Sequence, residues 1–223
     1  TSESVQKRMW LTGEALQSFM AGIGSEIGEP YRFAKGEQEN IVMYGVTIGA
    51  SFPVLNPLQA TLRGSSDLVL VGYNVKTRHV VYSTYLGSSG IEYIPSHAGW
   101  DWLCLQDGRA YACTDVGTSS DFPITHNLEG TVLPYSVEPD SLGPVLFSLS
   151  TNGSLYASTR IGGPAHLNSV EIACVDTCLY YFGAFQGDTL NQITSDAIEP
   201  NMVVPDRGLN TEDPIACGFF AVL

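Results

Sequence analysis

The chain has 223 residues, of which 44% are apolar and 15% are charged, a balance that supports a core and excludes an intrinsically disordered protein. Its formal net charge is −13, and residues 112–223 hold thirteen acidic residues against two basic ones, Arg160 and Arg207. A surface of this sign repels phosphate, which disfavours nucleic acid and anionic membranes as partners, and no apolar run is long enough to span a membrane.

The residues before Tyr31 contain the only segment with a helical pattern. Thr12 can cap a short helix over 14–21, which Gly22 would end, although a strand and a glycine-rich loop fit the same residues. The first residue is Thr1 rather than Met, and no charged and then apolar leader follows it. We therefore expect a processed product or an excised domain.

From residue 40 onward the hydrophobic pattern is that of short strands separated by proline and glycine. We predict strands over 41–50, 67–75, 78–86, 102–105, 110–113, 145–150, 154–159, 170–175, 177–182 and 215–223. The longest irregular stretches are 87–99, 115–130 and 186–200. With no repeat and no clean linker, the pattern predicts a single all-β domain over 1–223, an antiparallel sandwich or barrel with long surface loops.

Three tight turns join neighbouring strands into hairpins. Lys76-Thr77 would connect the first pair, whereas Asp107-Gly108 and Asn152-Gly153 tolerate the positive φ that two-residue hairpin turns require. The last turn is also a glycosylation sequon, but a turn needs the asparagine and glycine for backbone reasons alone. We therefore interpret all three first as turns.

The first two hairpins differ in how polar their faces are. With Lys76-Thr77 as the turn, Tyr73 lies opposite Val80 and Val71 opposite Tyr82, which gives one apolar side and a half-buried pair. The hairpin around Asp107-Gly108 has no polar face, because residues 102–105 and 110–113 are apolar throughout. It should therefore lie between layers or against another chain, and we expect an apolar homodimer.

The chain has five cysteines, and an odd number argues against a disulfide-stapled secreted scaffold. Cys174 and Cys178 would be about 13 Å apart in one extended strand, which is too far for a bridge. We expect structural thiols, with one disulfide as the less favoured alternative, and no metal site. Folding and ligand binding should then withstand chelator and alkylating agent.

Catalytic patterns are hard to find. The nearest phrase to a serine-protease nucleophile turn, Gly187-Asp188-Thr189-Leu190, lacks the serine and the following glycine, and all four histidines are isolated. Metal-ligand spacings and a phosphate-binding glycine loop are absent from the sequence, so we expect no cofactor. A pair of carboxylates suited to glycoside hydrolysis would be invisible to sequence spacing and stays open.

Binding is the remaining class of function, and two short segments are candidates. Trp100 and Asp101 combine an aromatic face with a carboxylate, which suits carbohydrate or protein contact, although a tryptophan at a strand's start can equally be core. Lys76, Thr77 and Arg78 form a basic turn that is more often simply solvated. The acidic surface suits plain solubility, or a basic partner in a larger assembly.

The phrases Asp67-Leu-Val-Leu-Val-Gly-Tyr-Asn74 and Leu149-Ser-Thr-Asn-Gly-Ser-Leu155, in an acidic and loop-rich all-β chain, resemble the projecting domain of a non-enveloped virus capsid. The resemblance is closest to the astrovirus capsid spike. It implies a β-barrel-like core, a two-fold dimer on the virion surface, attachment to a host cell-surface receptor (protein or glycan), and recognition by neutralising antibodies. The resemblance does not assign a binding role to any individual residue of this chain. The alternatives are a secreted β-sandwich carbohydrate-active hydrolase and a non-viral lectin.

The hairpin pattern and the proline spacing predict little helix. Far-UV circular dichroism of the chain should report less than about a quarter helix, against roughly 30–35% in an average protein. A larger helical fraction would contradict the all-β prediction.

Overall fold

The computed structural model of the chain describes residues 27–35, 40–93, 103–116, 119, 121–125, 143–160, 166–175, 178–186 and 216–222. These residues contain strands, turns and loops but no helix, as the strand pattern predicts. Among them there is accordingly no helix of the length and hydropathy needed to cross a membrane. The segment 14–21, for which we predict a helix, lies outside the described residues.

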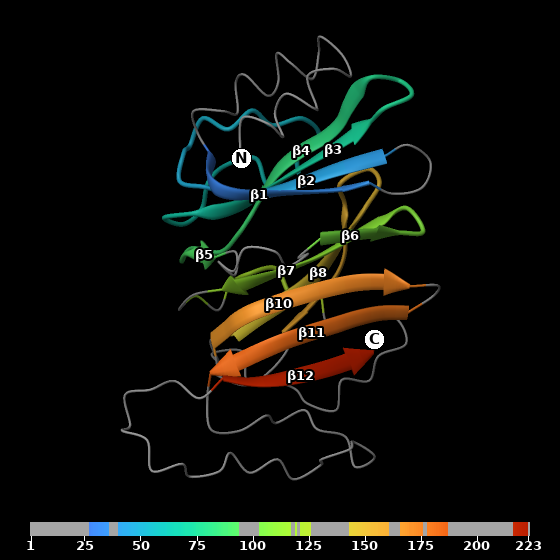
Figure 1. Cartoon of the computed structure of the whole chain (residues 1–223). Coiled ribbons are helices and arrows are strands. Elements are labelled where there is room, and N and C mark those ends of the chain that lie inside the picture. Colours follow the sequence, from blue (N-terminus) through green and yellow to red (C-terminus); the bar gives the residue numbers. More distant parts are fainter. Residues whose placement is uncertain are drawn as a thin grey trace, which may run out of the picture.

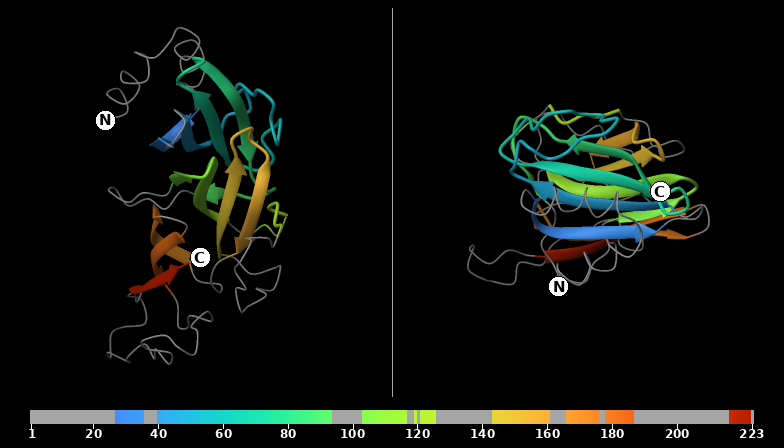
Figure 2. Two further views of the ribbon diagram at one scale, coloured as in Figure 1. Left: turned by 90° about the vertical axis from the view of Figure 1, so that its right-hand side faces the viewer. Right: turned by 90° about the horizontal axis from the view of Figure 1, so that it is seen from above.

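In the described part of the chain, twelve strands form three antiparallel sheets, none of which closes on itself. They are β1 (Ile27–Lys35), β2 (Asn40–Thr47), β3 (Asp67–Asn74), β4 (His79–Leu86), β5 (Glu92–Tyr93), β6 (Leu103–Gln106), β7 (Arg109–Val116), β8 (Gly143–Ser150), β9 (Leu155–Arg160), β10 (His166–Val175), β11 (Cys178–Gln186) and β12 (Ala216–Val222). The first sheet is ordered β1-β2-β3-β4 and the third β10-β11-β12, while the middle sheet runs β5-β7-β8-β9 with β6 also on β7. The middle sheet lies between the other two (Figures 1 and 2).

Strands β3 and β4 are buried on both faces over most of their length, which is more burial than the half-buried pair expected for them. Leu68 and Leu70 face the middle sheet, whereas Val69 and Val71 pack with Phe52 from the segment after β2. That segment also covers the free edge of β4, because Leu55 and Ser83 exchange backbone hydrogen bonds of 3.0 and 2.8 Å. The added cover comes from the stretch 48–66, whose irregular sequence gives no periodic signal.

A β-bulge corrects the predicted register of the first hairpin. Tyr73 pairs with Val80 as expected, but Gly72 then pairs with Tyr82, and Val71 with Ser83. One extra residue, Val81, therefore lies on the β4 side, and it moves Tyr82 from the predicted face to the opposite one. A bulge of this kind shifts every later pair by one residue, so it cannot be inferred from alternation alone.

Strand β1 was not predicted, and its sequence shows why. It contains Pro30, which cannot donate a ladder hydrogen bond, and its pairing with β2 shifts register between Gly28 and Arg32. Proline is tolerated here because β1 is an edge strand and the irregularity lies around the proline. The short strand β5 likewise lies within a stretch predicted to be a loop.

The hairpin β6-β7 lies between layers, as its two apolar faces predict. The Asp107-Gly108 turn has φ values of 50° and 73°, and Leu103 pairs with Ala112 on the side of the first sheet. Tyr44 of β2 meets Phe147 of β8 edge-on across this boundary, with ring centroids 6.0 Å apart. Because both of its faces are covered by sheets of the same chain, this hairpin does not require a partner chain.

A disulfide joins the middle and third sheets, which corrects the expectation of structural thiols for two of the five cysteines. Cys104 of β6 is bonded to Cys174 of β10, with the two Cα atoms 6.1 Å apart. Cys113 is buried and takes no part in that bond. The paired residues are 70 positions apart and come from facing sheets, so sequence spacing held no signal for them.

Removing this disulfide should destabilise the domain. Closing a 70-residue loop restricts the unfolded chain, and the change Cys104→Ala with Cys174→Ala should lower the free energy of unfolding by about 2–4 kcal/mol. Urea unfolding with and without reductant measures the effect. Reductant should weaken the wild type and leave the double variant unchanged; a wild type that is indifferent to reductant would contradict the prediction.

Candidate functional site

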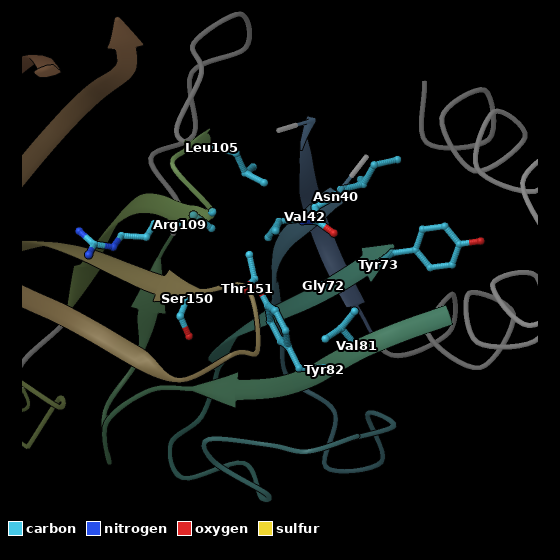
Figure 3. Close-up of a pocket in the computed structure, with 13 residues that line it drawn as sticks. Asn40, Val42, Gly72, Tyr73, Val81, Tyr82, Leu105, Arg109, Ser150 and Thr151 are labelled. Carbon is cyan, nitrogen blue, oxygen red and sulfur yellow. The ribbon is translucent and has the colours of Figure 1, made fainter. Parts of the chain in front are cut away.

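Three hairpin turns gather at one end of the sheet stack, which we call the hairpin end (Figure 1). They are the β3-β4 turn at 75–78, the β6-β7 turn at 107–108 and the β8-β9 turn at 151–154. Beneath them is a small cavity of about 20 Å³, room for about one water molecule, between the first and middle sheets (Figure 3). Residues from all three hairpins line it, among them Tyr73, Arg109 and Thr151.

The turn at 75–78 contains three of the predicted site residues, and all three are exposed. The side-chain oxygen of Asn74 accepts hydrogen bonds from the Thr77 backbone N–H, at 2.9 Å, and from the Thr77 hydroxyl, at 3.2 Å. Asn74 in turn donates to the side-chain oxygen of Asn40 on β2 at 3.0 Å. These bonds fix the turn to the neighbouring strand, so Lys76 and Arg78 project from a supported position.

Arg78 occupies a backbone conformation that its side chain does not favour. Its φ is +59°, in the left-handed region where glycine and asparagine are usual and other residues are uncommon. Glycine at this position would relieve the strain.

Positive charge at the hairpin end is extended by Arg109 on β7. Its guanidinium carbon lies 3.5 Å from the ring centroid of Tyr156, a cation–π contact, and a hydrogen bond with Tyr111 raises the pKa of Arg109. Tyr156 is the extra residue of a bulge, because Leu149 pairs with Leu155 and the adjacent pair contains Ala157. Asp107 is the only acidic residue in these three turns, so the described turns are basic on an acidic chain.

Trp100 and Asp101, the other two predicted site residues, lie outside the described residues. The structure therefore brings Lys76, Thr77 and Arg78 together as one turn. It does not describe Trp100 and Asp101. Arg109 and Tyr156 were missed by sequence reasoning, because their contact spans two hairpins. The only signal was an arginine placed directly after the Asp107-Gly108 turn.

Tyr82 joins the two sheets next to the cavity. Its ring fits between two glycines: a methyl group at Gly72 would lie under 3 Å from the ring, and one at Gly153 would lie 2.5 Å from Cγ. Gly153 also has a φ of +85°, which a larger residue would strain. The β8-β9 turn thus needs its glycine both for its backbone and for the approach to Tyr82.

The carboxylate pair that a glycoside hydrolase would need has a counterpart at the opposite end of the sheets. Asp67 begins β3 and Glu92 begins β5, and burial raises the pKa of Glu92 to about 7. A raised pKa is what a general acid requires. Both side chains, however, are fully buried at 0% exposure, so a sugar cannot reach them as the residues stand.

Other chemistry finds little support in the part of the chain that the structure describes. No group of three histidine, cysteine, aspartate or glutamate side chains there is arranged to hold a metal ion. His79 is exposed at the start of β4, while His97 and His126 fall outside the described residues.

No protein-family model matches the chain, and no curated protein is significantly similar to it in sequence.

Two tyrosines that face the middle sheet should respond differently to loss of their hydroxyl. The Tyr44 hydroxyl donates to the Cys113 carbonyl oxygen at 2.7 Å, so Tyr44→Phe should cost about 1 kcal/mol of unfolding free energy. The buried Tyr82 hydroxyl has no hydrogen-bond partner among the described residues, so Tyr82→Phe should be neutral or stabilising. Urea unfolding of both variants compares them; an equal loss in Tyr82→Phe would mean that its hydroxyl is bonded to water in the cavity.

Proposed function

We propose that this chain is an attachment domain, a virus capsid spike that binds a host cell-surface protein or glycan through its hairpin end. The observation that carries the proposal is the basic, backbone-supported turn Lys76-Thr77-Arg78 on an acidic all-strand scaffold. Binding residues are commonly presented on loops by a rigid scaffold, and this turn has that form. The resemblance to astrovirus spikes supplies the viral setting.

The charge distribution favours an anionic or strongly polar partner at this end. Lys76 and Arg78 form no ion pair with any described residue, whereas Arg63, near the opposite end, lies 3.3 Å from Asp121. Two unpaired cations can therefore meet an acidic glycan or an acidic protein surface without first breaking an internal contact. Complementary charge also raises the rate of encounter at low salt.

The finer architecture and the assembly belong to the same proposal. Three stacked antiparallel sheets are compatible with a β-sandwich-like spike core, exposed on the virion surface and accessible to neutralising antibodies. The homodimer expected of such a spike now rests on the resemblance, since the β6-β7 hairpin is covered within the chain. A secreted hydrolase is the alternative enzyme class, and a non-viral lectin the alternative binding class.

The binding proposal predicts a separation of binding from stability. Arg78→Gly should weaken binding several-fold while leaving stability equal or higher, because glycine relieves the positive φ. Lys76→Glu should weaken binding as well, and Arg63→Gln is the matched control at the other end. The probes are an array of neutral, sialylated and sulfated glycans and labelled domain on cultured cells with and without protease treatment.

The same glycans should be tested for hydrolysis. Stable binding without turnover, reduced by the two turn variants and not by Arg63→Gln, would support the attachment proposal. Turnover without stable binding would favour the hydrolase. A domain that binds neither glycans nor cells, or whose binding ignores both turn variants, would contradict a site at the hairpin end.

A further inference from the structure

The two buried carboxyl groups opposite the hairpin end lie around a single glycine. Gly87 follows the last residue of β4, and a methyl group there would lie 2.6 Å from Asp67 Oδ1 and 2.8 Å from Glu92 Oε2. The two oxygens thus flank the same small space, which only a residue without a side chain leaves open. The backbone holds them there, because the Glu92 N–H donates to the carbonyl of Ser66, next to Asp67, at 3.3 Å.

The hydrogen-bond partners distinguish the two groups. Asp67 accepts three bonds: from the Gln59 side chain at 2.6 Å, the Arg63 N–H at 2.9 Å and the Gly64 N–H at 3.2 Å. This set satisfies an ionised carboxylate.

Glu92 is satisfied on one oxygen only. Its Oε1 accepts from the Ser88 N–H at 3.0 Å and from the Ser88 hydroxyl. Its Oε2 is buried and has no hydrogen-bond partner among the described residues. A buried carboxylate oxygen in this position is costly as an anion, whereas a protonated one can act as a donor.

We propose that Glu92 and Asp67 form a proton-binding pair, with Glu92 protonated and Asp67 ionised, and that this pair couples the connection between β4 and β5 to pH. The proton on Glu92 Oε2 faces the Asp67 carboxylate across Gly87. Losing it places two negative charges beside one another in a buried site. The connection is then most stable when the proton is bound.

The charged and titratable groups around Glu92 agree with this arrangement. They are Asp67 on β3, Tyr44 on β2, Asp115 on β7 beside the residue that pairs with Glu92, Asp121 after β7, and its partner Arg63 before β3. Burial, then Asp67, then Asp121 raise the pKa of Glu92, against the lowering effect of the Ser88 hydrogen bonds, to about 7. Arg63, whose backbone N–H donates to Asp67, has its guanidinium bound to Asp121, whose pKa is lowered first by its hydrogen bond from Ser119.

The direction of the pH effect follows from linkage. The pKa of Glu92 rises from its ordinary value of 4.5 to about 7 on folding, so the folded state holds the extra proton between those values. This contribution to stability is complete below about pH 4.5 and is lost as the pH rises through about 7. The melting temperature of the wild type should therefore fall between about pH 5 and pH 8.

Thermal unfolding followed by circular dichroism tests the pair. In Glu92→Gln the side chain is neutral at every pH and can donate toward Asp67, so the fall in melting temperature between about pH 5 and pH 8 should shrink by at least half. Asp107→Asn is the matched control: the same change at a turn carboxylate of the hairpin end, at a φ of 50° that asparagine tolerates. It should keep the wild-type slope.

A second measurement does not depend on how the variant folds. Carbon-13 NMR of the glutamate side-chain carboxyls in the wild type should show one group titrating near pH 7, missing from Glu92→Gln if that variant folds. If every glutamate titrates below about pH 5.5, the proposal is overturned. It is also overturned if Glu92→Gln folds and keeps the full wild-type slope.

Discussion

The burial of the middle sheet on both faces is the constraint on which the other features depend. In the β6-β7 hairpin, residues 103–105 and 110–113 are apolar on both faces, so water must be excluded on two sides. The first sheet covers one side, with Tyr44 and Tyr82 reaching across, and the third sheet covers the other, with Cys104 bonded to Cys174. The chain therefore places most of β7 and β8 in its interior.

The charged side chains of the two features described above lie at the ends of the strands. At the hairpin end the β3-β4 turn exposes Lys76 and Arg78, supported by hydrogen bonds such as that from Thr77 to Asn74, while Arg109 at the start of β7 packs on Tyr156. At the other end the carboxyl groups of Asp67 and Glu92 are buried, and one Glu92 oxygen has no hydrogen-bond partner among the described residues. In the functions that we propose, one end meets a charged partner and the other responds to protons.

The candidate site was only partly predictable from the sequence. Lys76, Thr77 and Arg78 were found because a basic turn between two alternating strands is a local pattern. The contact of Arg109 with Tyr156 and the approach of Glu92 to Asp67 join residues far apart in the chain, on different elements. No spacing rule links such residues, because their separation in space is set by how the sheets stack and by bulges that shift the register.

What the sequence by itself determined was local: the all-strand character, the three hairpin turns, and the two apolar faces of β6-β7, since alternation and turn chemistry act over a few residues. Tertiary structure decided the rest. The bulge at Val81 moved Tyr82 to the opposite face, Pro30 was accommodated at a sheet edge, and the Cys104–Cys174 pair formed between facing sheets. Each of these depends on which strands meet, and that is fixed by burying both faces of the middle sheet at once.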